Sequence, residues 1–165
     1  MPDSSPWPLQ RDCREFYGNP RLRNFERLNI TTVVCPWRIV YEGEPIRGNG
    51  IRINKKCAAS LARVLLSVWD LVDHSQAEIE RLHYHMYSGS FVVRSMRGLA
   101  SLSMHAYGAA IDWDDEHNEH HSRHHMLQED SLLIQQFKKE GWIWGGNWPW
   151  PGIDAMHVQA ARIHE

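Results

Sequence analysis

The sequence predicts an α+β fold in which a small, mainly antiparallel sheet is flanked by helices. Short runs rich in β-branched and aromatic residues indicate strands, and two segments with apolar residues at three- and four-residue intervals indicate helices. These elements are mixed without a repeating strand–helix–strand rhythm, which disfavours a doubly wound parallel sheet. The chain has 165 residues, a length typical of one domain around one core.

The chain divides into a short arm and a domain. Residues 1–29 are polar and rich in Pro, Arg and Asn, which indicates an extended arm wrapped on the domain or a poorly ordered lead-in. Residues 30–165 are expected to form a single domain. Its first run, ITTVVCPWRIVY, predicts one or two short strands with Pro36 at an edge or a bend.

The segment after Asn54 gives the clearest helix. Asn54 is a suitable N-cap, and the following KKCAASLARVLLSVWDLV places its apolar residues on one helical face. These residues are Cys57, Leu61, Val64, Leu65, Val68 and Val72. A second helix is predicted over 128–141, with acids in its first turn, lysines in its last turn and a glycine stop.

Further strands are predicted in three places. Residues 81–94 alternate apolar and polar side chains, with a bend at 88–90. His83 and His85 would share one face of this strand, as partly exposed sheet residues rather than ligands. Short strands are also expected within AAIDW and AMHVQ.

Composition narrows the class of partner. Lys+Arg 18 and Asp+Glu 20 give a net charge of -2, which argues against a nucleic-acid or anionic-membrane surface. Cys13, Cys35 and Cys57 form no Cys-x-x-Cys pair, so neither a disulfide framework nor a thiolate zinc site is indicated, and Cys35 and Cys57 are expected in the core. The first residues lack the pattern of a secretory signal, and no run approaches the roughly 18 apolar residues of a membrane span. We therefore expect cytoplasmic synthesis and no membrane partner.

Two segments offer the ligands of a hydrolytic metal site. Such a site needs three nitrogen or oxygen ligands and an open position, on rigid elements that converge. In SMHAYGAAIDW, His105 is followed by a turn at Gly108 and a strand that carries Asp112 back to the level of the histidine. In PGIDAMHVQ, His157 begins or lies within a strand, and Asp154 stands at its mouth.

These residues suggest a division of roles. His105, Asp112 and His157 would ligate the metal, and Asp154 would lie beside the open position as a free base. A metal of this kind lowers the pKa of water toward about 7, while a separate carboxylate moves the proton to the leaving amine. Taken singly, each residue also has a simpler interpretation, as a turn cap or a buried hydrogen-bonded histidine, because no HExxH helix fixes the geometry locally.

The two segments resemble the signatures of the M15 family of zinc peptidases, which includes D,D-carboxypeptidases, D-Ala-D-Ala dipeptidases and phage L-alanyl-D-glutamate endopeptidases. Residues 103–112 meet the first signature, S-x-H-x-x-G-x-A-x-D, and residues 154–157 meet the second, D/E-x-x-H. The run GWIWGGNW is similar to one that precedes the second signature in many phage members. The resemblance covers roughly residues 80–160 and implies the metal fold that this family shares with lysostaphin and the hedgehog signalling domain.

The resemblance assigns roles to individual residues. It implies one zinc ion per chain held by His105, Asp112 and His157, with Asp154 as general base and acid. Zinc is the expected ion, although a site with two histidines and one aspartate also accepts other divalent ions.

The substrate-binding residues are less closely defined. YSGSFVVRSMRG is similar to the family segment that carries an arginine for the substrate or the oxyanion; Arg94 is the best positional match and Arg97 a near rival. Ser103 would either hydrogen-bond substrate or shape the turn before the first histidine. The tryptophans of 142–150 favour packing, with one or two as cleft walls, and Trp144 is the candidate for that role.

The conspicuous histidines of 117–125 are interpreted as part of a solvated connector. His117, His121 and His125 fall at four-residue intervals, so a helical stretch there would alternatively bind a transition metal at its surface. The family has no ligand at these positions, and the resemblance therefore favours the connector.

The sequence thus predicts a zinc metallopeptidase that cuts a peptide bond in bacterial peptidoglycan stem peptide. The expected type is a monomeric phage or prophage endolysin, an L-alanyl-D-glutamate endopeptidase that reaches the cell wall after release from the cytoplasm. A D-Ala-D-Ala carboxypeptidase or dipeptidase is the first alternative. The second is a non-catalytic zinc-bearing binding module, and Asp154 argues against it because a structural site has no use for an unligated carboxylate.

Overall fold

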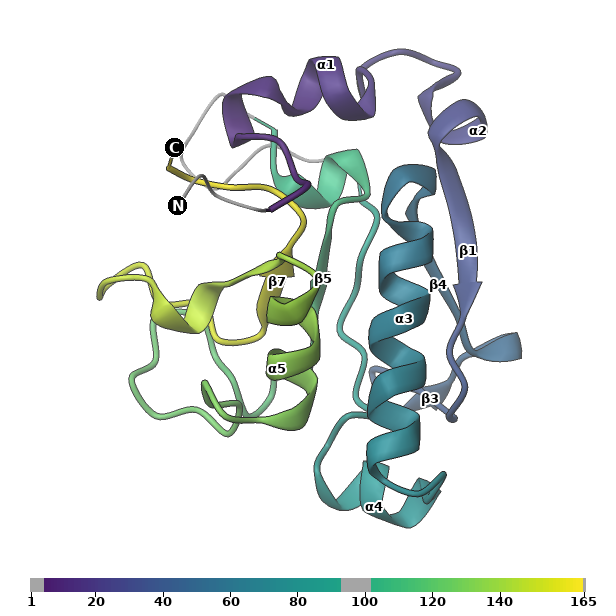
Figure 1. Ribbon diagram of the computed structural model, residues 1–165, viewed down its shortest axis with the longest axis vertical. Helices are drawn as coiled ribbons and strands as arrows, with labels where there is room; N and C mark the ends of the chain where they lie inside the picture. The colour runs from purple at the N-terminus through teal and green to yellow at the C-terminus, as the bar shows by residue number, and fades with distance from the viewer. Residues whose placement is uncertain (1–4, 93–101, 165) are drawn as a thin grey trace.

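The fold mixes α-helices with short antiparallel strands, as the sequence predicts (Figure 1). The computed structural model describes residues 5–92 and 102–164. The α+β class is confirmed, but within these residues the strands form three small antiparallel sheets instead of one.

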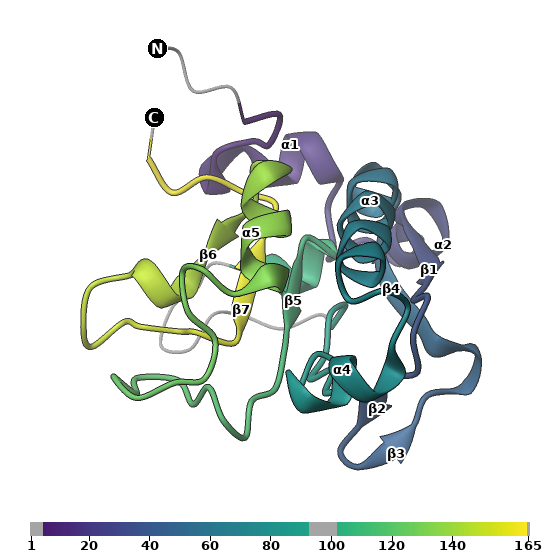
Figure 2. The ribbon, with the colours of Figure 1, turned by 60° about the horizontal axis from the view of Figure 1, so that its bottom comes forward.

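Helix α3, Lys55–Leu71, is the centre of the molecule and confirms the clearest sequence prediction. The Asn54 side chain caps it by accepting a hydrogen bond of 3.0 Å from the backbone N–H of Lys56. Figures 1 and 2 both show α3 between the β1–β4 pair on one side and α5, Leu132–Lys139, on the other. Its apolar face therefore packs against both halves of the fold and fixes their relative position.

The strands pair antiparallel in each sheet. The first sheet joins β1, Ile30–Val34, to β4, Gly50–Asn54, and the second joins β2, Val40–Tyr41, to β3, Glu44–Pro45. The third has the order β5, Ala110–Asp112, then β7, His157–Gln159, then β6, Ile143–Trp144. Figure 2 shows this third sheet on the α5 side of the molecule. Pro36 lies in a bend between β1 and β2, as predicted.

The core is continuous and rich in large side chains. Among its fully buried members are Trp37, Leu61, Ile111, Phe137 and Trp142. Burial of each such side chain stabilises the fold by roughly 1.5–3 kcal/mol. The three cysteines are buried and free, which confirms the core role of Cys35 and Cys57 and extends it to Cys13.

The described part of the N-terminal segment is helical where an extended arm was expected. It contains a 3-10 turn at Gln10–Asp12 and the short helices α1, Cys13–Tyr17, and α2, Phe25–Asn29. Trp7, Cys13, Tyr17 and Phe25 are buried in it. These apolar side chains outweigh the polar composition of the segment, and the hydroxyl of Tyr17 donates to the backbone oxygen of Ala160, 2.6 Å away.

The strand predicted over 81–94 does not form in its described part, 81–92, where the backbone makes only isolated bridges. Helix α4, Gln76–Arg81, precedes it, capped by Ser75, whose hydroxyl accepts from the N–H of Glu78. The chain then turns, with His83 in the left-handed region at φ +64°, and forms isolated bridges to other segments at Met86 and Tyr87. This local turn overrides the alternating pattern, so His83 and His85 do not share a strand face.

One detail of the second half of the chain also differs from the prediction, and one alternative there fails. Glu129 and Asp130 precede α5 and do not lie in its first turn, while Lys138 and Lys139 are in the last turn as expected. Residues 117–125 form turns and bends, so the alternative of a helical surface site there is wrong. Across the described ranges, none of the helices combines the length and the apolar character of a membrane span.

Candidate metal centre

His105 lies on a short 3-10 turn, Met104–Tyr107, that ends at Gly108. The hydroxyl of Ser103 begins this turn by accepting from the N–H of His105 at 3.2 Å. Gly108 has φ +68°, and a Cβ there would lie 2.8 Å from the backbone nitrogen of Asn54, so the turn requires glycine. Asn54 caps α3 with its side chain and also fixes the turn that carries His105. Its backbone N–H donates to the backbone oxygen of Gly108 at 2.8 Å.

Asp112 and His157 are brought together by strand pairing. They are direct partners in the β5–β7 register, and Asp112 Oδ1 lies 3.0 Å from His157 Nδ1. The other carboxylate oxygen, Oδ2, lies 3.2 Å from His105 Nε2. All three potential ligand atoms lie within 4.8 Å of one another, so the three residues predicted as ligands do converge.

The tautomers of both histidines are set by their outer hydrogen bonds. His105 Nδ1 lies 2.7 Å from the backbone oxygen of Ser90, which can only accept, so Nδ1 carries the proton and Nε2 has the lone pair. His157 Nε2 lies 2.9 Å from Gln159 Oε1, and the Gln159 amide nitrogen donates to the oxygen of Ala161 at 2.9 Å. His157 therefore donates through Nε2 and presents the lone pair of Nδ1 to Asp112.

This arrangement fits a metal ion. Two neutral imidazole nitrogens and a carboxylate are all acceptors, and acceptors repel one another unless a proton or a cation lies among them. His105 Nε2 is buried without a hydrogen-bond partner despite its closeness to Asp112. One divalent ion would bind all three atoms, and this donor set suits zinc.

The pKa shifts of Asp112 and His157 agree with a site that favours positive charge. Burial raises the pKa of Asp112, but contacts with His105 and His157 outweigh burial and hold it below its usual range. Burial lowers the pKa of His157, yet the Asp112 carboxylate outweighs that effect and raises it. The pocket therefore favours a cation beside Asp112.

Asp154 lies close to this centre but is not one of its three ligand candidates. Its Oδ1 is buried without a hydrogen-bond partner, and burial, with a smaller contribution from Asp112, raises its pKa. Its backbone N–H donates to the oxygen of Gly145 at 2.9 Å. A Cβ on Gly145 would lie 2.4 Å from the oxygen of Asp154, so glycine is needed for this close approach.

Two cavities meet at the candidate ligands. A cleft of about 400 Å³ is lined by His105, Asp112, Asp154 and His157. A second cavity of about 520 Å³ also reaches His105 and Asp112 and is lined by Arg52 and Phe91. Both cavities therefore reach two of the three candidate ligands.

Residues 97–160 match a family model of the M15 peptidases that is described as D-alanyl-D-alanine carboxypeptidase. This match supports an M15 family peptidase. The matched segment contains the three ligand candidates and Asp154. Neither the comparison with curated proteins nor that with solved structures gives a match.

The tryptophan that faces the candidate metal centre is not the one expected. Trp144 is buried, and its indole N–H donates to the backbone oxygen of Ala155 at 2.8 Å. A Cβ on Gly146 would lie 2.1 Å from the Trp144 ring, which shows how closely the chain passes over it. Trp148 lines the cleft instead, with its ring centroid 5.5 Å from that of His157.

The remaining predicted residues have mixed outcomes. Ser103 lines the cleft and shapes the turn, and its contact with substrate stays a prediction. Arg94 and Arg97 lie outside the described residues. Gln159 was missed, although it stands two residues after His157 and so on the same face of β7, a spacing that would have marked it.

Proposed function

We propose that this chain is a zinc-dependent peptidase that hydrolyses a peptide bond in the stem peptide of bacterial peptidoglycan. The observation that carries the proposal is the convergence of His105 Nε2, the Asp112 carboxylate and His157 Nδ1 at one cleft wall, with Asp154 beside them. The M15 match supports a peptidase. One zinc ion per chain would be held by the three converging residues.

The proposed chemistry divides between the ion and the protein. When bound, zinc supplies the Lewis acid that activates water and the scissile carbonyl. Asp154 takes the proton at its carboxylate and returns it to the leaving amine, and the burial that raises its pKa suits the return step. Arg94, or its rival Arg97, would hold the oxyanion of the substrate.

The arrangement of the cavities favours an endopeptidase of the L-alanyl-D-glutamate type. An endopeptidase must hold substrate on both sides of the scissile bond, and both cavities reach His105 and Asp112. We further propose that the protein acts as a monomer on the cell wall after its release, as a phage endolysin does.

A D-Ala-D-Ala carboxypeptidase is the second candidate, and two observations favour it. The matching family model is described by that activity. Arg52 lines the second cavity, where a guanidinium can hold the terminal carboxylate of a substrate. A dipeptidase needs the same kind of anchor.

Digestion of defined muropeptides separates these candidates. The zinc-loaded protein should release fragments from purified peptidoglycan, lose this activity with a chelator and regain it with zinc. Mass spectrometry should then show a new N-terminal D-glutamate for the endopeptidase, or loss of terminal D-alanine for the carboxypeptidase. Zinc binding with no cleavage of any muropeptide would contradict both and support the non-catalytic module.

A further inference from the structure

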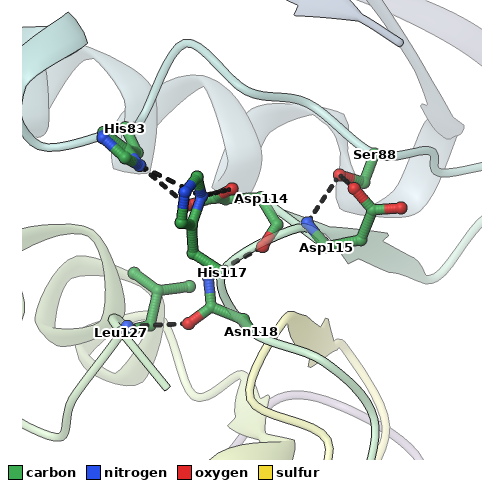
Figure 3. A network of polar contacts seen from close by, with 7 residues as sticks. All are labelled: His83, Ser88, Asp114, Asp115, His117, Asn118 and Leu127. Carbon is green, nitrogen blue, oxygen red and sulfur yellow. Dashed lines mark hydrogen bonds and ion pairs between the residues drawn. The ribbon is translucent and has the colours of Figure 1, made fainter. Parts of the chain in front are cut away.

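A second group of metal-ligating side chains lies outside the centre described above. His83, Asp114 and His117 bring one ligand atom each to within 4.8 Å of the others. Figure 3 shows the two imidazole rings meeting at the Asp114 carboxylate. His83 follows α4, while Asp114 and His117 follow β5. Two segments distant in sequence therefore supply the group.

The distances suit a single small cation. His83 Nδ1 lies 3.1 Å from Asp114 Oδ2, His117 Nδ1 lies 2.7 Å from Asp114 Oδ1, and the two nitrogens are 3.3 Å apart. Ligands of tetrahedral zinc, at about 2.0–2.1 Å from the ion, are separated by about 3.3 Å. Small movements of these side chains would therefore complete three coordination bonds.

The charge of Asp114 also calls for a cation. The residue is 2% exposed, and a buried carboxylate is costly unless its charge is compensated. Within 5–92 and 102–164, its ion-pair contacts are with His83 and His117. Neutral histidines give hydrogen bonds without charge, so the group is balanced only by an added proton or by a metal ion.

The Asp114 backbone is held rigidly in place. Its N–H donates to the oxygen of Met86 at 2.7 Å, and its own oxygen accepts from the Asn118 side chain at 2.8 Å. Asn118 is completely buried and accepts from the N–H of Leu127 at 2.7 Å, as Figure 3 shows. Support of this kind orients a ligand before the ion binds.

The two histidines leave the site accessible. The side chains of His83 and His117 are 30% and 40% exposed, so an ion can enter from solvent and water can fill the fourth position. We propose that His83, Asp114 and His117 form a second site for a divalent transition metal, distinct from the M15 centre. Its ion would fasten the turn after α4 to the end of β5, two residues beyond Asp112.

Metal stoichiometry tests this second site with zinc alone as the probe. Four proteins are loaded with zinc and separated from free zinc by gel filtration. The number of zinc ions per chain is then measured by elemental mass spectrometry. We expect two ions in the wild type, one in His83→Asn/His117→Ala, and one in Asp112→Asn/His157→Ala, which lacks the M15 centre. The exposed His124→Ala variant controls for weak binding by surface histidines and should keep two. Asn is chosen at position 83 because it tolerates the positive φ.

Thermal unfolding gives a second readout that does not require the variant of the new site to fold. Zinc should raise the melting temperature of Asp112→Asn/His157→Ala, because an ion that binds the folded state stabilises it. Two results together would exclude the second site. Zinc would leave the melting temperature of Asp112→Asn/His157→Ala unchanged, and His83→Asn/His117→Ala would bind as many zinc ions per chain as the wild type. That result would leave the proposed peptidase unaffected, since its ion is counted separately in His83→Asn/His117→Ala.

Discussion

Asp112 and His157 face each other as direct partners across β5 and β7, with 3.0 Å between Oδ1 and Nδ1. The candidate centre therefore depends on strand register, because a slip of one residue would turn one of these side chains to the opposite face. Hydrogen bonds on both sides secure the register. The backbone N–H of Trp113 donates to the backbone oxygen of Met156 at 2.9 Å. On the other side, the backbone N–H of Ala160 donates to the backbone oxygen of Ala109 at 2.8 Å.

Replacement of Gln159 by Leu should weaken zinc binding by about 10–100-fold. Gln159 accepts the Nε2 proton of His157 and so keeps the Nδ1 lone pair directed at the ion. Competition with a chromogenic chelator measures the affinity. Gln159→Glu keeps an acceptor oxygen and should retain more of the affinity than Gln159→Leu. Equal affinities for the two variants would show that the tautomer is fixed by another contact.

The candidate ligands could be predicted from sequence because each belongs to a compact local pattern. His105 and Asp112 are joined by one turn and one short strand, and Asp154 and His157 are three residues apart. The β5–β7 pairing that unites the two patterns is a long-range contact that neither pattern encodes by itself.

Other features could not be read from local patterns. The second histidine group brings together His83 and Asp114, which lie on separate segments and both have positive φ, and no periodicity signals this. The helices of the N-terminal segment depend on Tyr17 and Phe25 reaching a core built by later residues. Composition alone therefore suggested an arm.

Gly145→Ala should impair catalysis by displacing Asp154. The new Cβ would lie 2.4 Å from the Asp154 oxygen, and relief of such a contact moves the backbone at a cost of about 1–3 kcal/mol. Muropeptide turnover should fall at least tenfold while zinc stoichiometry is kept. Gly152→Ala is the matched control, since its Cβ would meet Pro149 at 3.3 Å. Similar turnover for both variants would argue against a special role for Gly145.

Asn54→Ala should lower the free energy of unfolding by about 1–3 kcal/mol. The variant loses the cap of α3 and a buried hydrogen bond of 2.9 Å from the Asn54 amide to the Tyr107 oxygen. Urea denaturation measures the change. Asn24→Ala replaces an exposed residue that begins α2 without a side-chain cap, and its effect should stay within about 0.5 kcal/mol. An equal loss in both variants would contradict the stabilising role of these two side-chain contacts of Asn54.

Cys35 should contribute to the alkaline sensitivity of the fold. Burial raises the pKa of its thiol from 9.0 to about 12, against a smaller opposing effect of a backbone hydrogen bond with Trp37. The folded state thus holds this proton more tightly than the unfolded state, so the thiol's contribution is complete below pH 9 and is lost as the pH rises toward 12. Cys35→Ala should unfold more easily at pH 8, but its stability should fall less steeply between pH 9 and 11. Parallel stability curves from urea denaturation would refute this.

Asp154→Asn should abolish most peptide hydrolysis while leaving the zinc ion in place. The amide keeps the size of the side chain but cannot take a proton, and loss of a general base typically costs 10²–10⁴-fold in rate. Asp154 is not one of the three converging ligand candidates, so zinc stoichiometry and melting temperature should match the wild type. Asp130→Asn, at an exposed position before α5, is the control for removal of one negative charge. A zinc-loaded Asp154→Asn protein that cleaves muropeptides at the wild-type rate would require a different base, and the unpartnered Oδ1 of Asp154 would then need another explanation.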